Sequence, residues 1–201
     1  VSVGSEDCLY LNIYIPKNQT DFNKNQFPVM FWIHGGSNIW GSGDFYDFSK
    51  LATTQQVIVI TINYRLGLFG WFSSKHLRNT ASGLDKSSNF GQLDLIKGLE
   101  WVQENISAFG GDKDNITIFG ESAGGHNVLT LLASPLSEGL FHKAISQSGY
   151  VSSYTQKFAE EESELSSKKI FAEETKFLVS DAEVADYLRS LSSEEVYQKY
   201  V

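Results

Sequence analysis

The stretch Gly120-Glu121-Ser122-Ala123-Gly124 decides the fold of this chain. Residues 116–119 before it are β-branched and aromatic, as in a buried strand, and residues 127–133 after it carry apolar side chains at helical spacing. A serine at such a tight strand-to-helix turn has a strained backbone, and side chains in place of its glycines would collide with the neighbouring strand and helix. The pattern predicts that Ser122 is a nucleophile presented between a strand and a helix.

A second apolar strand, Phe31-Trp32-Ile33, runs into the turn His34-Gly35-Gly36-Ser37. Glycine turns of this kind supply backbone N–H groups to an oxyanion hole, with the N–H after the nucleophile as their partner. Together with residues 6–16 (Glu-Asp-Cys-Leu-Tyr-Leu-Asn-Ile-Tyr-Ile-Pro), these segments resemble the type-B carboxylesterases, the family that also contains cholinesterases and the adhesion protein neuroligin.

The resemblance extends over many blocks in the expected order. Residues 6–16 resemble one family signature and residues 109–124 the other, and residues 63–67, 89–94 and 146–149 are similar to further family blocks. The similarity is strong from Val1 to about Ser153. It implies an α/β-hydrolase fold with a mostly parallel sheet flanked by helices. Family members are far longer, so we expect an incomplete fold that lacks the N-terminal part and most of the C-terminal half.

The resemblance also assigns site residues beyond the nucleophile. It implies that the backbone N–H groups of Gly36, Ser37 and Ala123 form the oxyanion hole. Here the chain departs from the family, because Ser37 and Asn38 stand where the family has a third glycine and a phenylalanine. Glu121 resembles a residue that lines the substrate gorge, and a carboxylate bonded to backbone and water is the alternative. Ser148 resembles a residue that supports the catalytic carboxylate.

A serine nucleophile needs a base, and the chain offers four histidines for that role. In this fold the order along the chain is serine, then a carboxylate, then histidine. His34 and His76 precede Ser122, His126 lies one helical turn after it, and His142 comes directly before a strand. We therefore expect structural roles for all four. The resemblance implies that the Glu and His of the triad lie beyond Val201.

Strand-like and helix-like segments alternate along the chain. We expect strands at residues 9–15, 29–34, 57–63, 116–121 and 144–147, and helices at 47–55, 91–106 and 123–133. Alternation of this kind predicts a mainly parallel sheet. Residues 35–44 and 67–88 read as long loops. Residues 1–153 form a partial hydrolase core in this interpretation, and residues 154–201 form a helical cap within the same domain.

Composition excludes several classes of function. The 201 residues are 41% hydrophobic and 20% charged with a net charge of −8, which is ordinary for a globular protein. The sequence contains no basic patch for nucleic acid and no apolar run of about 18 residues that could span a membrane. The resemblance implies a small ester as the binding partner, with no metal and no cofactor, and leaves the oligomeric state open. The single cysteine, Cys8, favours a bacterial-type member without fixing the compartment.

Three functions remain compatible with these residues. The first is a carboxylic-ester hydrolase that works through an acyl-serine intermediate. The second is a non-catalytic adhesion or binding homologue of the same fold, and the third is a serine amidase or peptidase. Neuroligin-like relatives have lost the nucleophile, whereas Ser122 and both glycines of its turn are intact here. This favours the enzyme but does not identify its ester.

Overall fold

The computed structural model describes residues 4–17 and 26–200 and divides into two compact units. One unit, here called the sheet unit, comprises residues 8–17, 26–65 and 91–151. The other, the helical unit, comprises residues 4–7, 66–90 and 152–200. Residues 152–200 thus group with residues 66–90, an association between distant segments that the sequence pattern did not indicate.

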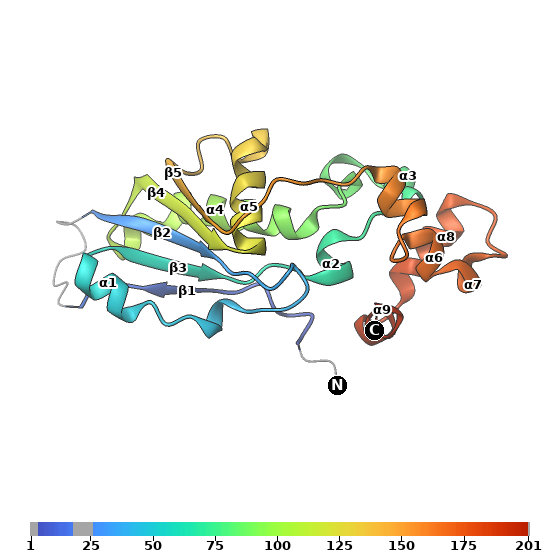
Figure 1. Ribbon diagram of the computed structural model, residues 1–201, viewed down its shortest axis with the longest axis horizontal. Coiled ribbons are helices and arrows are strands. Elements are labelled where there is room, and N and C mark those ends of the chain that lie inside the picture. The colour runs from blue at the N-terminus through green and yellow to red at the C-terminus, as the bar shows by residue number, and fades with distance from the viewer. Residues whose placement is uncertain (1–3, 18–25, 201) are drawn as a thin grey trace. The chain divides into compact units, whose positions relative to one another are not determined.

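The sheet unit is built on five strands that lie side by side in the order β1-β3-β2-β4-β5 (Figure 1). Neighbouring strands run parallel except β1, which pairs antiparallel with β3. The mainly parallel sheet predicted from the alternation of elements is therefore confirmed. The strands are β1 (Leu11–Tyr14), β2 (Phe27–Ile33), β3 (Ile58–Ile62), β4 (Gly111–Glu121) and β5 (Lys143–Gln147).

Helices cover both faces of this sheet, which explains why β2 is apolar throughout and β3 is apolar except for Thr61. On one face, Trp32, Val59 and Phe119 form a cluster with Ala52 of α1 (Ser49–Gln55). On the other face lie α4 (Phe90–Asn105) and α5 (Ala123–Ala133). A methyl group on Gly98 of α4 would press against Ile62 and Phe31, so the helix backbone lies directly on the sheet.

An ion pair joins the end of β3 to α4. The backbone N–H, Nε and Nη2 of Arg65 all donate to the carboxylate of Asp94, at 2.9, 2.8 and 2.8 Å. Asp94 is buried, so these three hydrogen bonds satisfy a carboxylate that would otherwise be costly inside the protein.

Strand β4 begins at Gly111, earlier than the expected residue 116. Phe27 pairs with Gly111, and the register then shifts so that Val29 pairs with Ile116, which marks a β-bulge. The intervening residues are polar, and the backbone N–H of Asp114 donates to the Asp112 carboxylate at 3.0 Å. Polar residues in a bulge lack the apolar alternation from which a strand is predicted.

The prediction of a long loop at residues 67–88, in the helical unit, is wrong. That segment contains α2 (Gly67–Trp71), α3 (Lys75–Thr80) and a 3-10 turn (Gly83–Lys86). These pieces are too short for helical periodicity to show in the sequence. The rest of the unit comprises a π-helical turn (Phe158–Glu162), α6 (Ser167–Ile170), α7 (Ala172–Thr175), α8 (Asp181–Ser190) and α9 (Ser193–Tyr200).

Charged groups tie α3 to the later part of the helical unit. Arg78 Nη2 donates to both carboxylate oxygens of Glu160, at 2.8 and 2.9 Å, and the Ser73 hydroxyl adds a third hydrogen bond at 3.0 Å. His76 Nδ1 lies 2.6 Å from the carboxylate of Asp181, the first residue of α8. Side chains of α3 therefore contact both the π-helical turn and α8.

Candidate active site

Ser122 occupies the turn between β4 and α5, as the sequence predicts. The strand ends at Glu121, the helix begins at Ala123, and Ser122 between them has φ 56° and ψ −120°. A residue with a Cβ atom rarely adopts positive φ, so the surrounding structure must hold this conformation. Two backbone hydrogen bonds do so: the Ser122 N–H donates to Gln147 O at 2.9 Å, and the His126 N–H donates to Ser122 O at 2.9 Å.

Close backbone packing explains the two glycines of the turn. A methyl group on Gly124 would overlap the carbonyl oxygen of Ile33 in β2. One on Gly120 would lie 2.6 Å from the carbonyl group of Gly124 and 2.7 Å from Ile33 O. The obstacles are backbone atoms, which cannot rotate away. Glycine at both positions therefore allows the start of α5 to lie against the ends of β2 and β4.

The loop after β2 lies beside this turn. A methyl group on Gly35 would come within 2.7 Å of Glu121 O and 3.2 Å of Ser122 Cβ, so loop and nucleophile are in close approach. Gly36 has φ 106°, and its carbonyl accepts the N–H groups of Ile39 and Trp40 at 2.9 and 3.1 Å. That turn uses the carbonyl of Gly36 and leaves its N–H outside the hydrogen-bonding pattern of the loop.

Ser37 and Asn38 follow in the same left-handed conformation, with φ 57° and 58°. Within the described residues, no backbone carbonyl accepts the N–H of Gly36 or Ser37. Ala123 is the first residue of α5, where an N–H has no acceptor inside its helix. Backbone N–H groups that find no backbone acceptor among the described residues are of the kind that can stabilise an oxyanion.

The side chain of His34 is 1% exposed and makes contacts that hold the loop after β2 in place. Its Nδ1–H donates to Gly35 O at 2.7 Å, its ring stacks on Tyr64 with centroids 4.4 Å apart, and the Tyr64 hydroxyl donates to His34 O at 2.5 Å. Burial lowers the pKa of His34, although the hydrogen bond to Gly35 opposes this, and burial raises the pKa of Tyr64. Both side chains are therefore neutral structural groups.

Two asparagines that no sequence pattern pairs, Asn38 and Asn127, link the loop to α5. Asn127 Nδ2 donates to Asn38 Oδ1 at 2.9 Å, and Asn38 Nδ2 lies 3.5 Å from Asn127 Oδ1. Asn127 is 1% exposed, and its carbonyl oxygen accepts from Gln92 Nε2 of α4 at 3.3 Å. The departure at Asn38, a polar residue where the family has phenylalanine, indicates a polar contact at this position but does not identify Asn127 as its partner.

Glu121 and Ser148 both lie in the sheet unit, at the ends of β4 and β5. Glu121 is exposed, and its Oε2 would lie 3.3 Å from a methyl group on Gly35, which places the carboxylate at the side of the loop. Ser148 is exposed and has φ 52°. Exposure leaves both side chains accessible to a ligand or to another segment of protein, and their roles stay predictions.

The four histidines each use Nδ1 away from Ser122. His34 Nδ1 donates to Gly35 O, His76 Nδ1 contacts Asp181, His126 Nδ1 contacts the carbonyl of Tyr150, and His142 Nδ1 accepts from the N–H of Ile116. Over the described part of the chain, no hydrogen bond joins a histidine ring to the Ser122 hydroxyl. Nor do these residues contain a cluster of three side chains suited to hold a metal ion.

In the described ranges, no helix is both long enough and apolar enough to cross a bilayer.

Comparisons with known proteins show the family of the chain. A model of the carboxylesterase family matches residues 1–201. The chain is 52% identical to para-nitrobenzyl esterase of Bacillus subtilis over 147 residues, which cover 72% of the chain and 28% of that protein. It is 50% identical to cocaine esterase of Homo sapiens over 147 residues, covering 72% of the chain and 24% of that protein.

Solved structures extend the similarity beyond that region. A thermophilic PNB esterase superimposes with a TM-score of 0.80 and 40% identity, over 97% of the chain and 37% of that structure. The chain spans about a quarter of the length of the curated relatives it matches.

Proposed function

The chain belongs to the carboxylesterase family, and on this premise we propose that it carries the nucleophile and the oxyanion-binding groups of a serine carboxylesterase. The observation that supports this most directly is the strained backbone of Ser122, with φ 56°, at the junction of β4 and α5. A conformation that costs on the order of 1–3 kcal/mol persists where function requires it.

In the proposed reaction, the Ser122 hydroxyl attacks the carbonyl carbon of an ester. The carbonyl oxygen becomes an oxyanion, which accepts hydrogen bonds from the N–H groups of Gly36, Ser37 and Ala123. Collapse of this intermediate expels the alcohol and leaves an acyl group on Ser122, and water then releases the acid. The Ser122 proton passes to the histidine that family resemblance places beyond Val201.

The substrate is proposed to be a small carboxylic ester. Relatives of similar identity are named para-nitrobenzyl esterase, cocaine esterase and pyrethroid hydrolase, so closely related chains act on quite different esters. The N–H groups around Ser122 would bind the reacting carbonyl group, which all of these esters share. Selectivity among esters must therefore come from side chains around this centre, and Glu121 is our candidate for one of them.

The test is hydrolysis of p-nitrophenyl acetate by the full-length protein and its Ser122→Ala variant. We expect the variant to lose at least 1,000-fold in kcat, in line with the loss of a covalent nucleophile. Ser107→Ala is the matched control, because it removes an exposed serine hydroxyl from the same unit and should leave kcat unchanged. The 201-residue chain alone should show no turnover. Wild-type kcat in the Ser122→Ala variant would refute the assignment.

A further inference from the structure

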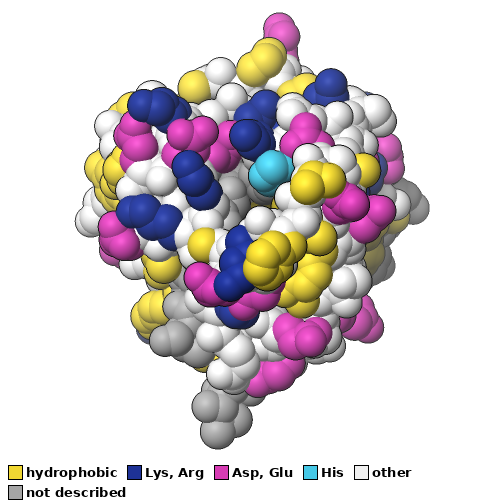
Figure 2. Space-filling model, turned by 90° about the vertical axis from the view of Figure 1, so that its right-hand side faces the viewer, with side chains coloured by type: hydrophobic (Ala, Val, Ile, Leu, Met, Phe, Trp, Pro, Cys, Tyr) yellow, Lys and Arg dark blue, Asp and Glu magenta, His cyan; other side chains and the backbone are white. Residues whose placement is uncertain are grey.

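The helical unit contains a cavity of about 150 Å³ between α3, the π-helical turn, α6 and α8. Figure 2 shows a hollow with both basic and acidic side chains around it on the face that carries the helices drawn in orange and red in Figure 1. Pockets for drug-sized ligands measure about 300–1,000 Å³, so this one suits a much smaller molecule. All of its lining residues belong to the helical unit, and none belongs to the site around Ser122.

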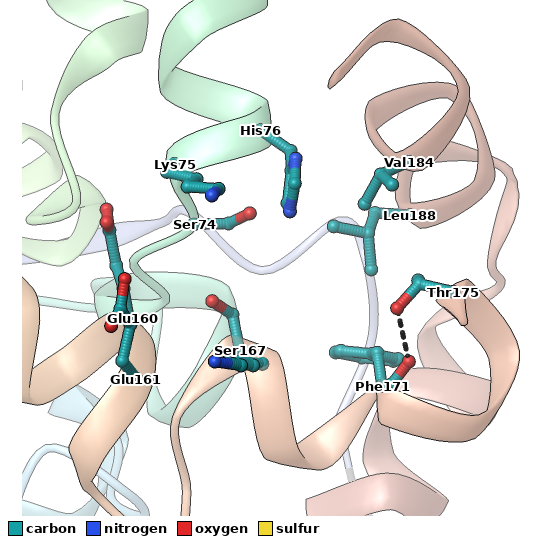
Figure 3. Close-up of a pocket in the computed structure, with 11 residues that line it drawn as sticks. Ser74, Lys75, His76, Glu160, Glu161, Ser167, Phe171, Thr175, Val184 and Leu188 are labelled. Atoms are coloured by element: carbon teal, nitrogen blue, oxygen red, sulfur yellow. Dashed lines mark hydrogen bonds between the residues drawn. The ribbon is translucent and has the colours of Figure 1, made fainter. Parts of the chain in front are cut away.

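An unsatisfied hydroxyl group lies in the wall of this cavity. Ser74 is 4% exposed, and its Oγ has no hydrogen-bond partner within the described residues. Figure 3 shows this hydroxyl directed into the space between Lys75, His76 and Ser167. Buried polar groups are almost always hydrogen-bonded, so an orphaned hydroxyl that faces a cavity indicates a missing partner.

The helical unit holds an unusual share of such atoms. In the part of the chain that the structure describes, six buried side-chain atoms lack a partner, and four of them belong to this unit. They are Ser74 Oγ, Arg78 Nε, Ser166 Oγ and Glu174 Oε2. Of these four, Ser74 Oγ is the one that belongs to a residue lining the cavity, and a hydroxyl can donate a hydrogen bond to an acceptor placed there.

The charges around the cavity also favour an anion. Lys75, His76 and Lys168 contribute to its lining. Of the two acidic residues, Glu160 is already neutralised by Arg78 and hydrogen-bonded by Ser73, which leaves Glu161 as the one acidic lining group without such a partner among the contacts described. His76 is oriented by Asp181 through Nδ1, so its Nε2 can face a ligand.

The opposite wall of the cavity is apolar. Val184 and Leu188 reach into it from α8, and the ring of Phe171 lies below them (Figure 3). The nearby hydroxyl of Thr175 is used by the backbone, since it donates to Phe171 O at 2.7 Å. This wall offers no polar group of its own beyond that satisfied hydroxyl, and it therefore suits a short hydrocarbon chain.

We propose that this cavity binds a small aliphatic carboxylate. The Ser74 hydroxyl donates to one carboxylate oxygen, the Lys168 ammonium group supplies positive charge, and the alkyl chain lies against Phe171, Val184 and Leu188. The site does not use Ser122, so the proposal is independent of the esterase assignment.

The proposal is tested by titrating the full-length protein with butyrate and measuring binding by saturation-transfer difference NMR. Two probes of the same chain length serve as comparisons: 1-butanol lacks the charge and butylamine reverses it. We expect saturable binding of butyrate, at least fivefold weaker binding of 1-butanol and no binding of butylamine. Absence of saturable butyrate binding, or equal binding of 1-butanol, would overturn the proposal.

Variants locate the binding. Ser74→Ala and Lys168→Met should each weaken butyrate binding at least fivefold, whereas the matched controls Ser107→Ala and Lys113→Met in the sheet unit should not. Lys168 is exposed, so its replacement leaves the fold intact even if Ser74→Ala does not fold. Unchanged affinity in Lys168→Met and in a folded Ser74→Ala variant would show that butyrate binds elsewhere, for example beside Ser122, and would overturn the assignment to this cavity.

Discussion

At the scale of single residues, the geometry around Ser122 depends on backbone atoms that approach closely. Gly124 is the tightest case, because any side chain there would overlap the carbonyl oxygen of Ile33. Two features therefore hold the strained φ of Ser122. They are the close packing of Gly124 against the carbonyl oxygen of Ile33 and the two backbone hydrogen bonds of Ser122 itself. Stability and the position of the nucleophile are coupled at this turn.

Replacement of Gly124 by alanine tests this coupling. We expect Gly124→Ala to lower the free energy of unfolding by about 3 kcal/mol, at the upper end of overpacking effects, because the obstacle is backbone. The control is Gly139→Ala, which also replaces a glycine, with φ 76°, but has nothing within 4 Å of the added methyl group. It should cost only about 1 kcal/mol of backbone strain. Urea denaturation measures both, and equal costs would contradict the packing argument.

His34 gives a second prediction, on pH. Burial lowers its pKa below the ordinary 6.5, so between 6.5 and that lowered pKa the unfolded chain binds a proton that the folded chain does not. Stability is therefore lost as pH falls through this range, with a slope approaching about 1.4 kcal/mol per pH unit. Denaturation of the wild type and of His34→Gln between pH 7 and 5 measures the difference. Parallel pH profiles would show that His34 does not titrate as described.

A local sequence pattern predicts some of these residues and not others. Ser122, its two glycines and the loop at Gly36 are recognisable because their roles depend on immediate neighbours in the chain. The pair between Asn38 and Asn127 joins positions that are distant in sequence, and nothing local to either residue specifies the other. Likewise, the contact of His76 with Asp181 depends on how the helical unit folds.

At the scale of elements, the buried strands and long helices were the predictable part. Strand β3 is buried at every position and α5 matches its expected bounds, Ala123–Ala133. The bulge that starts β4 and the short helices α2 and α3 were missed. Each has polar residues or too few turns to show a periodicity. In α3, the hydrogen bonds from Arg78 to Glu160 stabilise the short helix from outside.

The ion pair between Arg65 and Asp94 joins the end of β3 to α4, and we expect it to contribute to the free energy of unfolding. Asp94→Ala removes three hydrogen bonds to a carboxylate whose side chain is 8% exposed, whereas the Arg65 side chain is 38% exposed and can turn towards water. We expect a loss of about 1.5 kcal/mol in the free energy of unfolding, the lower end for bonds to charged groups. Glu100→Ala, which breaks an exposed pair with Lys97 on the same helix, should have no measurable effect. Equal losses in the free energy of unfolding for the two replacements would contradict the claim that the buried ion pair contributes more than the exposed one.

At the scale of the whole molecule, the candidate active site and the cavity belong to different units. The nucleophile, both glycines of its turn and the loop donors all belong to the sheet unit. The helical unit carries the cavity and most of the orphaned buried polar atoms of the described residues. The family signatures also fall mainly in segments of the sheet unit. A function could therefore be predicted from the sequence for the sheet unit, whereas none could be predicted for the helical unit.

The central claim, that Ser122 is an acylatable nucleophile, is tested most directly by covalent labelling. The full-length protein is treated with a fluorophosphonate, which forms a stable adduct with an activated serine, and the modified peptide is identified by mass spectrometry. We predict one adduct per chain, located on Ser122, and none in the Ser122→Ala variant. An adduct on a different residue, or an unlabelled Ser122 in a folded protein, would contradict the account.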